Sequence, residues 1–321
     1  MIPAGLLLAY ALLTATLGAW WLRRAAWPQH APRLGVAVWQ ALSVSTALSV
    51  VLASLVVTIP RGAVGAGFAE LLRACVWALR AEYGAVGGPL MGAAGAAVGG
   101  GVAARAAYCL IRESAAAVRE RRRHAALLAP VARLDTRLRA LVVPCEAAAA
   151  YCLPGGHGRI VLTTGALDVL DPGQLTGVLA HERAHLRGRH HLAVGVAVAL
   201  ARAFPGVPVF RHAADQIPQL LEMLADDAAV RHGDRGAHAA ALVALAARGG
   251  APARALAAGG PEALARVRRL VAPRRPFGPV RRAAALIGVV ALIALPIVVA
   301  AAPALAAAQT PHCPVEVSVL G

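Results

Sequence analysis

The five residues from His181 to His185, which read HERAH, have the types and spacing most able to support chemistry. An α-helix turns about 100° per residue, so two side chains four residues apart lie on one face and can bind one metal ion. Glu182, next to His181, can reach a water molecule at that ion. Neutral imidazoles bind zinc at about 2.0–2.1 Å, and a catalytic zinc site keeps one position open for water. The motif therefore predicts a hydrolytic Zn²⁺ site with His181 and His185 as ligands and Glu182 as base.

A hydrolytic zinc site usually takes a third protein ligand, and residues 220–226 supply the candidates. This tract reads LLEMLAD, so Glu222 and Asp226 lie one helical turn apart in a mostly apolar segment. A solvated helix face is the alternative for both residues, but a carboxylate in an apolar tract needs a partner. We predict that Glu222 is the third metal ligand. Asp226 is predicted to orient one of the ligating histidines from behind.

Other polar residues near the motif are open to more than one interpretation. His190 and His191 are adjacent and therefore point to different faces, which predicts surface positions for both. His157, Arg231 and His232 are three candidates for stabilising an oxyanion, and the sequence does not choose among them.

The composition indicates a membrane protein. Of the 321 residues, 59% are hydrophobic and 15% are charged, and the mean hydropathy is +0.63. The net charge is +16, and every basic residue is arginine. Basicity alone is weak evidence for nucleic-acid binding when aromatic residues make up only 4% of the chain and no helix-turn-helix is recognisable. The predicted partners are therefore the lipid bilayer and a protein substrate, with no direct nucleic-acid binding.

Four apolar stretches are long enough to span a bilayer, at about 3–22, 36–59, 86–111 and 283–304. Arginines cluster between the first two stretches, after the third and before the fourth, which predicts that these three connections face the cytoplasm. Both termini, the loop 61–85 and the tail that follows the fourth stretch are then outside. The third stretch contains glycines four residues apart, which permit close helix packing: Gly88 with Gly92, and Gly95 with Gly99.

These patterns predict a mainly α membrane protein with four transmembrane helices. A cytoplasmic α+β zincin-like metallopeptidase domain is inserted between helices 3 and 4. The predicted divisions are 1–112 for the first three helices, 113–275 for the zinc metallopeptidase domain, and 276–321 for the fourth helix and a short outer tail.

Local signals place elements around the motif. A capping-box pattern marks the start of the helix that carries HERAH: Asp171 is followed by Pro172 and, three positions after Asp171, by Gln174. The predicted end of this helix is Gly188. The further predicted elements are strands at 141–143, 148–153 and 159–163, a short apolar helix at 192–204, and a helix from Pro218 to about Arg231 that ends at Gly233.

The order of motifs in this chain resembles the pattern of membrane gluzincin peptidases. It consists of HExxH, then an apolar helix ended by a proline, and then Glu-x-x-Ala-Asp from Glu222 to Asp226. Such peptidases include the BlaR/MecR-type sensor peptidases and, more distantly, the HtpX and CAAX-prenyl-protease group. The resemblance covers about residues 140–235, and four spans agree with the BlaR/MecR type. It implies the zinc ligands and the base named above. BlaR/MecR proteins carry a large β-lactam-binding domain after the last span, but here only residues 305–321 follow, so β-lactam sensing is not expected.

The predicted function is zinc-dependent hydrolysis of peptide bonds in a cytoplasmic or membrane protein, and the resemblance suggests a transcriptional repressor as substrate. Two alternatives remain, an HtpX-like quality-control protease and a non-catalytic membrane signalling scaffold. The strand at 159–163 either pairs with an extended substrate or lies inside the sheet. Under the predicted topology Cys75 and Cys313 are the only cysteines outside, where a disulfide between them would persist.

Overall fold

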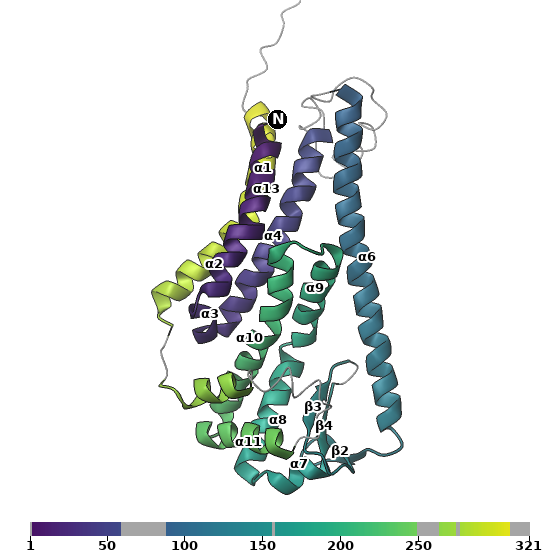
Figure 1. The fold of residues 1–321 in the computed structure, drawn as a ribbon, viewed down its shortest axis with the longest axis vertical. Helices are drawn as coiled ribbons and strands as arrows, with labels where there is room; N and C mark the ends of the chain where they lie inside the picture. The colour runs from purple at the N-terminus through teal and green to yellow at the C-terminus, as the bar shows by residue number, and fades with distance from the viewer. Residues whose placement is uncertain (1, 59–87, 156–157, 249–262, 274–276, 309–321) are drawn as a thin grey trace, which may run out of the picture.

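The structure, a computed structural model, describes residues 2–58, 88–155, 158–248, 263–273 and 277–308 (Figure 1). Most of these residues are helical, and a small sheet lies at one end of the elongated molecule. Four helices are long and apolar enough to cross a membrane: Ile2–Arg24, Pro32–Thr58, Gly92–Leu128 and Pro279–Ala302. The prediction of a mainly α protein with four such helices is therefore supported. The domain division and the membrane side stay predictions, and Cys75 and Cys313 lie outside the described residues.

The first apolar segment is not a uniform helix. It consists of α1 (Ile2–Leu13), a π-helical turn η1 (Thr14–Gly18) and α2 (Ala19–Arg24), and the short α3 (Trp27–His30) leads into α4 (Pro32–Thr58). Thr14 Oγ1 at the π turn donates to the Tyr10 carbonyl over 2.9 Å and lies 2.9 Å from Thr46 Oγ1 on α4. These bonds satisfy polar groups inside an otherwise apolar pair of helices.

Helix α6 (Gly88–Leu128) continues 17 residues beyond the predicted end of the third span at residue 111. It packs closely on α4, because a Cβ at Gly99 would lie 2.5 Å from Ser54 Cβ. Further along α6, the Arg105 side chain donates to the carbonyl of Ala203, near the end of a neighbouring helix. The helix therefore connects the apolar bundle with the part of the chain that carries the HERAH motif.

Replacement of Gly99 by leucine is expected to destabilise the α4–α6 contact, because Ser54 leaves no room for a side chain. We expect a loss of about 1–3 kcal/mol, the usual cost of overpacking. The measurement is the thermal unfolding midpoint in one detergent. Gly100→Leu is the matched control, since nothing lies within 4 Å of a Cβ at Gly100. Equal midpoints for the two variants would contradict the observed packing.

Helix α13 (Pro279–Ala308) lies beside α1 and α4 and contains Pro296 (Figure 1). A proline inside a helix cannot donate to the carbonyl four residues earlier, which is Leu292 here. That carbonyl instead accepts from Tyr10 Oη over 2.9 Å and from Ser45 Oγ over 2.6 Å. Pro296 thus leaves the Leu292 carbonyl available as an acceptor that links α13 to α1 and α4. The carbonyl and the two hydroxyl groups are satisfied among apolar helices.

The sheet has four short strands: β1 (Arg133–Asp135), β2 (Ala140–Val143), β3 (Ala150–Leu153) and β4 (Arg159–Thr163). Their order is β1-β2-β4-β3, with β2 and β4 parallel and the other pairs antiparallel. The three predicted strands are present, and β1 is additional. Because β4 is paired on both sides, the strand at 159–163 lies inside the sheet and has no free edge for a substrate.

The remaining helices are α7 (Thr164–Val169), α8 (Pro172–Arg187), α9 (His190–Ala203), α10 (Pro208–His232) and α11 (Arg235–Arg248), and residues 263–271 are also helical. Helices α9 and α10 lie between α4 and α6 (Figure 1). Their apolar faces form one core with α2 and α4, in which Trp39, Leu200, Phe210 and Leu220 are buried. The short apolar helix predicted at 192–204 therefore buries one face in this core.

The predicted start of α10 at Pro218 was wrong. The helix begins ten residues earlier, at Pro208, and Pro218 lies inside it. A proline inside a helix costs about 3 kcal/mol, but Ile217 and Leu220 on either side are buried in the core with α4. Burial of large side chains outweighs this local cost. The predicted end at Gly233 is confirmed.

Candidate metal centre

Helix α8 positions the HERAH motif, and its start is set locally. The Asp171 carboxylate accepts from the Gln174 backbone over 2.8 Å, and the Gln174 side chain accepts from the Asp171 backbone, which confirms the predicted capping box. His181 and Glu182 are buried, and His185 lies one turn further on the same face. Gly188 ends the helix, as predicted.

Glu222 comes from α10, which packs directly against α8. Its carboxylate oxygens lie 3.4 Å from His181 Nε2 and 3.3 Å from His185 Nε2, and the two nitrogens are 3.1 Å apart. The ligand atoms of these three residues all lie within 4.8 Å of one another, close enough to hold a single metal ion. The structure thus brings together the three residues that the sequence predicted as ligands.

Asp226 lies behind His181, on the side away from Glu222. Its Oδ1 is 3.0 Å from His181 Nδ1, and its side chain is 1% exposed. The contact is electrostatic, because Nδ1 is not aligned for a hydrogen bond. Such a carboxylate holds the ring in the orientation that leaves Nε2 free as a ligand. The position matches the one predicted for Asp226.

Two further residues that the sequence did not single out contact Asp226. Arg266, from the helix at 263–271, donates from Nε and NH2 to the two carboxylate oxygens over 2.8 and 2.6 Å. The same guanidinium lies 2.9 Å from Glu222 Oε2. His238, on α11, places Nε2 3.0 Å from Asp226 Oδ1. Arg266 therefore connects the candidate ligand with the carboxylate behind it.

The same geometry produces a second group that could hold a metal ion, formed by His181, Asp226 and His238. All three side chains are buried. However, the Asp226 carboxylate is already neutralised by the Arg266 guanidinium in a bidentate pair. A divalent cation at that position would face a fixed positive charge. The group with His181, His185 and Glu222 is therefore the better metal site.

His190 corrects one prediction. It is not a surface residue: it is 7% exposed, and its Nδ1 lies 2.9 Å from His185 Nδ1. The turn between α8 and α9 directs it there, because Arg189 adopts a left-handed conformation with φ 47°. This conformation is costly for a residue with a side chain and is maintained by the surrounding packing. Each candidate histidine ligand thus has a partner at Nδ1.

A cavity of about 390 Å³ opens over the three candidate ligands and is also lined by Glu182, Cys152 and Tyr151. Burial raises the pKa of Glu182, which favours its action as a base near neutral pH. Cys152, on β3, also lines the cavity beside Glu182, and burial together with this carboxylate raises the pKa of the thiol to about 12. The thiol is therefore protonated and a poor nucleophile.

The carboxylates of the site favour positive charge beside His181, while His185 stays neutral. Burial lowers the pKa of His185 to about 4, which keeps it neutral, the form that binds metals. Burial also disfavours charge on His181, yet Asp226 and Glu222 outweigh it and raise its pKa to about 9. Burial disfavours ionisation of Glu222, but His181 and Arg266 hold its pKa at about 2. Two imidazoles and an ionised carboxylate fit a zinc ion.

The predicted oxyanion candidates remain without support. Arg231 is exposed and does not line the cavity. His157 and the side chain of His232 lie outside the described residues. Arg266 lines the cavity and is the only arginine among its described lining residues.

Comparisons with known proteins agree with this chemistry. Residues 116–221 match the model of the family described as "Peptidase family M48". Two curated proteins named "Protease HtpX homolog" are similar over short stretches. The one from Aquifex aeolicus (strain VF5) is 44% identical over 48 residues, and the one from Acidiphilium cryptum (strain JF-5) is 47% identical over 47 residues.

Each of these alignments covers 15% of this chain and 16% of the relative, so the chain matches about one sixth of the relatives' length. No solved structure matches. The comparisons support the resemblance to membrane metallopeptidases of the M48 type, and they do not single out the BlaR/MecR type.

Proposed function

We propose that this protein is a membrane-embedded zinc endopeptidase in which His181, His185 and Glu222 hold the metal and Glu182 is the catalytic base. The observation that carries the proposal is the convergence of three ligand atoms within 4.8 Å, at a cavity that Glu182 also lines. Zinc bound there would supply a Lewis acid that lowers the pKa of a water molecule to about 7 and polarises the scissile carbonyl.

The residues of the chain then have separate tasks. Glu182 takes the proton of the attacking water at a carboxylate oxygen and returns it to the leaving amine. The protonated Cys152 thiol, which lines the same cavity as Glu182, is proposed to orient that carboxylate. Asp226 holds His181 from behind, and Arg266 holds both Asp226 and Glu222. These partners behind the ligands therefore limit how far the ligand atoms can move.

The substrate in this proposal is an extended peptide segment that pairs with the outer edge of β3. Residues Ala150, Tyr151 and Cys152 of this strand line the cavity, and within the described residues no strand pairs with that edge. Backbone pairing gives affinity for many sequences. A cytoplasmic or membrane protein, such as a transcriptional repressor in regulated proteolysis, is the proposed substrate class.

Quality control of membrane proteins is the second candidate, and the similarity to two HtpX homologues favours it. A non-catalytic signalling scaffold is a weaker alternative, because the base and all three candidate ligands are present and meet at one cavity.

Metal removal tests the proposal. Wild-type protein purified in detergent is expected to contain one zinc per chain and to cleave members of a quenched-fluorescence peptide library. Incubation with 1,10-phenanthroline should stop cleavage, and one equivalent of zinc should restore it. His181→Ala should contain no zinc, because it lacks a ligand. Full activity in the chelator, or one zinc per chain in His181→Ala, would overturn the proposal.

Replacement of His190 by alanine is expected to weaken zinc binding about 10–100-fold, the usual effect of losing a partner behind a ligating histidine. His185 Nδ1 must carry a proton when Nε2 is a ligand, and His190 Nδ1 is the acceptor 2.9 Å away. The measurement is zinc affinity by competition with a chromogenic chelator. His190→Asn should restore part of the affinity, and His191→Ala should leave it unchanged. Equal affinity of His190→Ala and His191→Ala would exclude this positioning role.

The active site is proposed to face the cytoplasm, with both termini outside, because the arginine clusters flank the spans on one side. Reporter fusions after residue 250 and at the C-terminus are expected to report opposite sides of the membrane. The same side for both fusions would refute the topology with four spans.

A further inference from the structure

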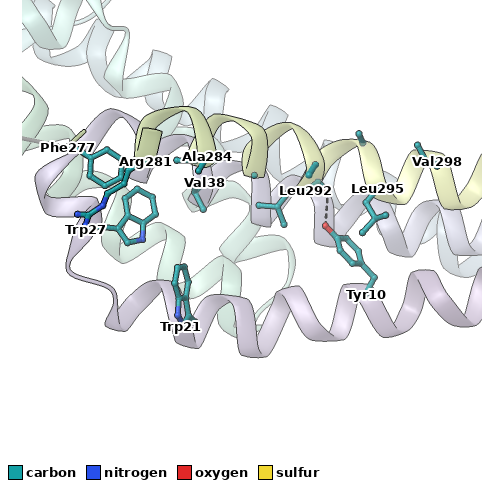
Figure 2. Close-up of a pocket in the computed structure, with 14 residues that line it drawn as sticks. Tyr10, Trp21, Trp27, Val38, Phe277, Arg281, Ala284, Leu292, Leu295 and Val298 are labelled. Carbon is teal, nitrogen blue, oxygen red and sulfur yellow. Dashed lines mark hydrogen bonds between the residues drawn. The ribbon is translucent and has the colours of Figure 1, made fainter. Parts of the chain in front are cut away.

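A second cavity, of about 960 Å³, lies far from the candidate metal centre, between α13 and the first apolar segment. Figure 2 shows α13 on one side and α1 and α2 on the other, with Trp21, Trp27 and Phe277 toward one end and Tyr10 toward the other. Among its fourteen lining residues only Arg281 is charged. The cavity is therefore an apolar space with a single cation near one end.

Within the part of the chain that the structure describes, Arg281 has no acidic partner. The sequence contains no aspartate or glutamate between residues 1 and 69 or between residues 263 and 315. Among the described residues, the Arg281 side chain forms no ion pair or hydrogen bond. It lies beside the rings of Trp27 and Phe277 (Figure 2). Arg23 and Arg24 in the last turn of α2 and Arg33 in the first turn of α4 add positive charge near the connection between these helices. The described residues therefore place no anion at this end of the cavity.

The part of the cavity between Arg281 and Leu292 matches the depth of one leaflet, and the lining continues along α13 to Val298. Arg281 and Leu292 are 11 residues apart on α13, a rise of about 16 Å at 1.5 Å per residue. Half of a hydrocarbon core about 30 Å thick is about 15 Å. Tryptophan and arginine at one end are typical of the headgroup level of a membrane. A molecule with its anionic group at Arg281 would therefore reach the bilayer midplane near Leu292.

The inner part of the cavity is crossed by the Tyr10–Leu292 hydrogen bond, which links α1 to α13. Figure 2 shows Tyr10 reaching across toward Leu292 between the two helices. A transmembrane helix about 10 Å across would have to displace this link to lie along the whole cavity. Flexible acyl chains can pass beside it. The shape thus favours a lipid over a helix of another protein.

We propose that this cavity binds one anionic glycerophospholipid, with its phosphate at Arg281 and its acyl chains between α13 and α1. An arginine–phosphate pair in an environment of low dielectric constant is a strong, charge-assisted contact. Each methylene of the acyl chains that is buried adds to the affinity. The site is independent of the proposed peptidase activity, since it shares no residue with the candidate metal centre.

Native mass spectrometry of the full chain in detergent tests the site, with added phosphatidylglycerol or phosphatidylcholine of the same acyl chains. One phosphatidylglycerol per chain is expected to bind at least tenfold more tightly than phosphatidylcholine. Arg281→Gln should abolish this preference. Arg282→Gln is the matched control, because its side chain does not line the cavity. Equal binding of the two lipids by wild type, or equal loss in both variants, would overturn the proposal.

A second pair of variants tests the acyl-chain space. Gly288 lines the cavity, and nothing lies within 4 Å of a Cβ placed on it, so Gly288→Leu fills the space without a clash. It should weaken phosphatidylglycerol binding at least fivefold, whereas Ala283→Leu, outside the cavity, should not. A photo-crosslinker at position 288 in native membranes is expected to yield a lipid adduct. A protein adduct in its place would show that a partner helix occupies the cavity and would refute the lipid assignment.

Discussion

The Glu182→Gln variant is expected to retain one zinc per chain and to lose peptidase activity about 10²–10⁴-fold in kcat/KM, the usual contribution of a general base. Glutamine has almost the same shape as glutamate but cannot take a proton from water. The side chain is buried beside Cys152 and is not one of the three candidate ligands, so zinc should stay bound. The measurements are metal content and cleavage of the peptide library.

Glu120→Gln is the matched control, since Glu120 is exposed on α6 and the variant changes the net charge equally. It should behave as wild type in both measurements. A comparison of cellular proteomes with wild-type and Glu182→Gln protein then identifies the substrates, which accumulate only with the inactive variant. Loss of zinc from Glu182→Gln would instead make Glu182 a structural residue of the site, and undiminished cleavage would exclude it as the base.

The Asp226→Asn variant is expected to lose about 3–5 kcal/mol of stability, the usual cost of leaving a buried charge without its partner. Asp226 is 1% exposed and accepts from Arg266 and His238 while also facing His181. An amide removes the negative charge and places N–H groups near donors. The thermal unfolding midpoint, measured with a chelator present so that zinc binding does not contribute, should fall by roughly 6–20 °C.

Asp227→Asn is the control for this result. Asp227 is adjacent in sequence and pairs with Arg269 in a similar bidentate contact of 2.9 Å, but the two side chains are 29% and 22% exposed. Solvent screens such a pair, so we expect a loss of about 0–1 kcal/mol. Zinc affinity should also separate the variants, since only Asp226 lies behind a candidate ligand. Similar losses of stability in the two variants would mean that the burial of Asp226 does not determine how much it contributes to stability.

The amino-acid sequence alone determined the features that depend on short-range spacing. Residues four apart on a helix share a face, which placed His181 with His185 and Glu222 with Asp226. The capping box at Asp171 and the end at Gly188 are also local, and the structure confirms both. The four apolar helices follow from their length and hydropathy.

Tertiary structure decided what depends on contacts between distant segments. Arg266 lies 40 residues after Asp226, and no pattern in its own basic helix distinguishes it from Arg269. His190 was predicted at the surface because adjacent histidines point to different faces, but the left-handed turn at Arg189 separates α8 from α9 and directs His190 to His185. The available signal in the sequence for this contact was His190, which follows the HExxH motif five residues after His185.

The same distinction explains the remaining differences. A strand looks alike whether central or at an edge, so only pairing showed that β4 is internal and that β3 has the free edge. Pro218 carries a local signal for a helix start, yet burial of its neighbours against α4 extends α10 across it. Local propensities differ by about 1–3 kcal/mol, and burial of several large side chains contributes more than that. Short-range spacing therefore placed the candidate ligands, and long-range packing selected the residues that hold them.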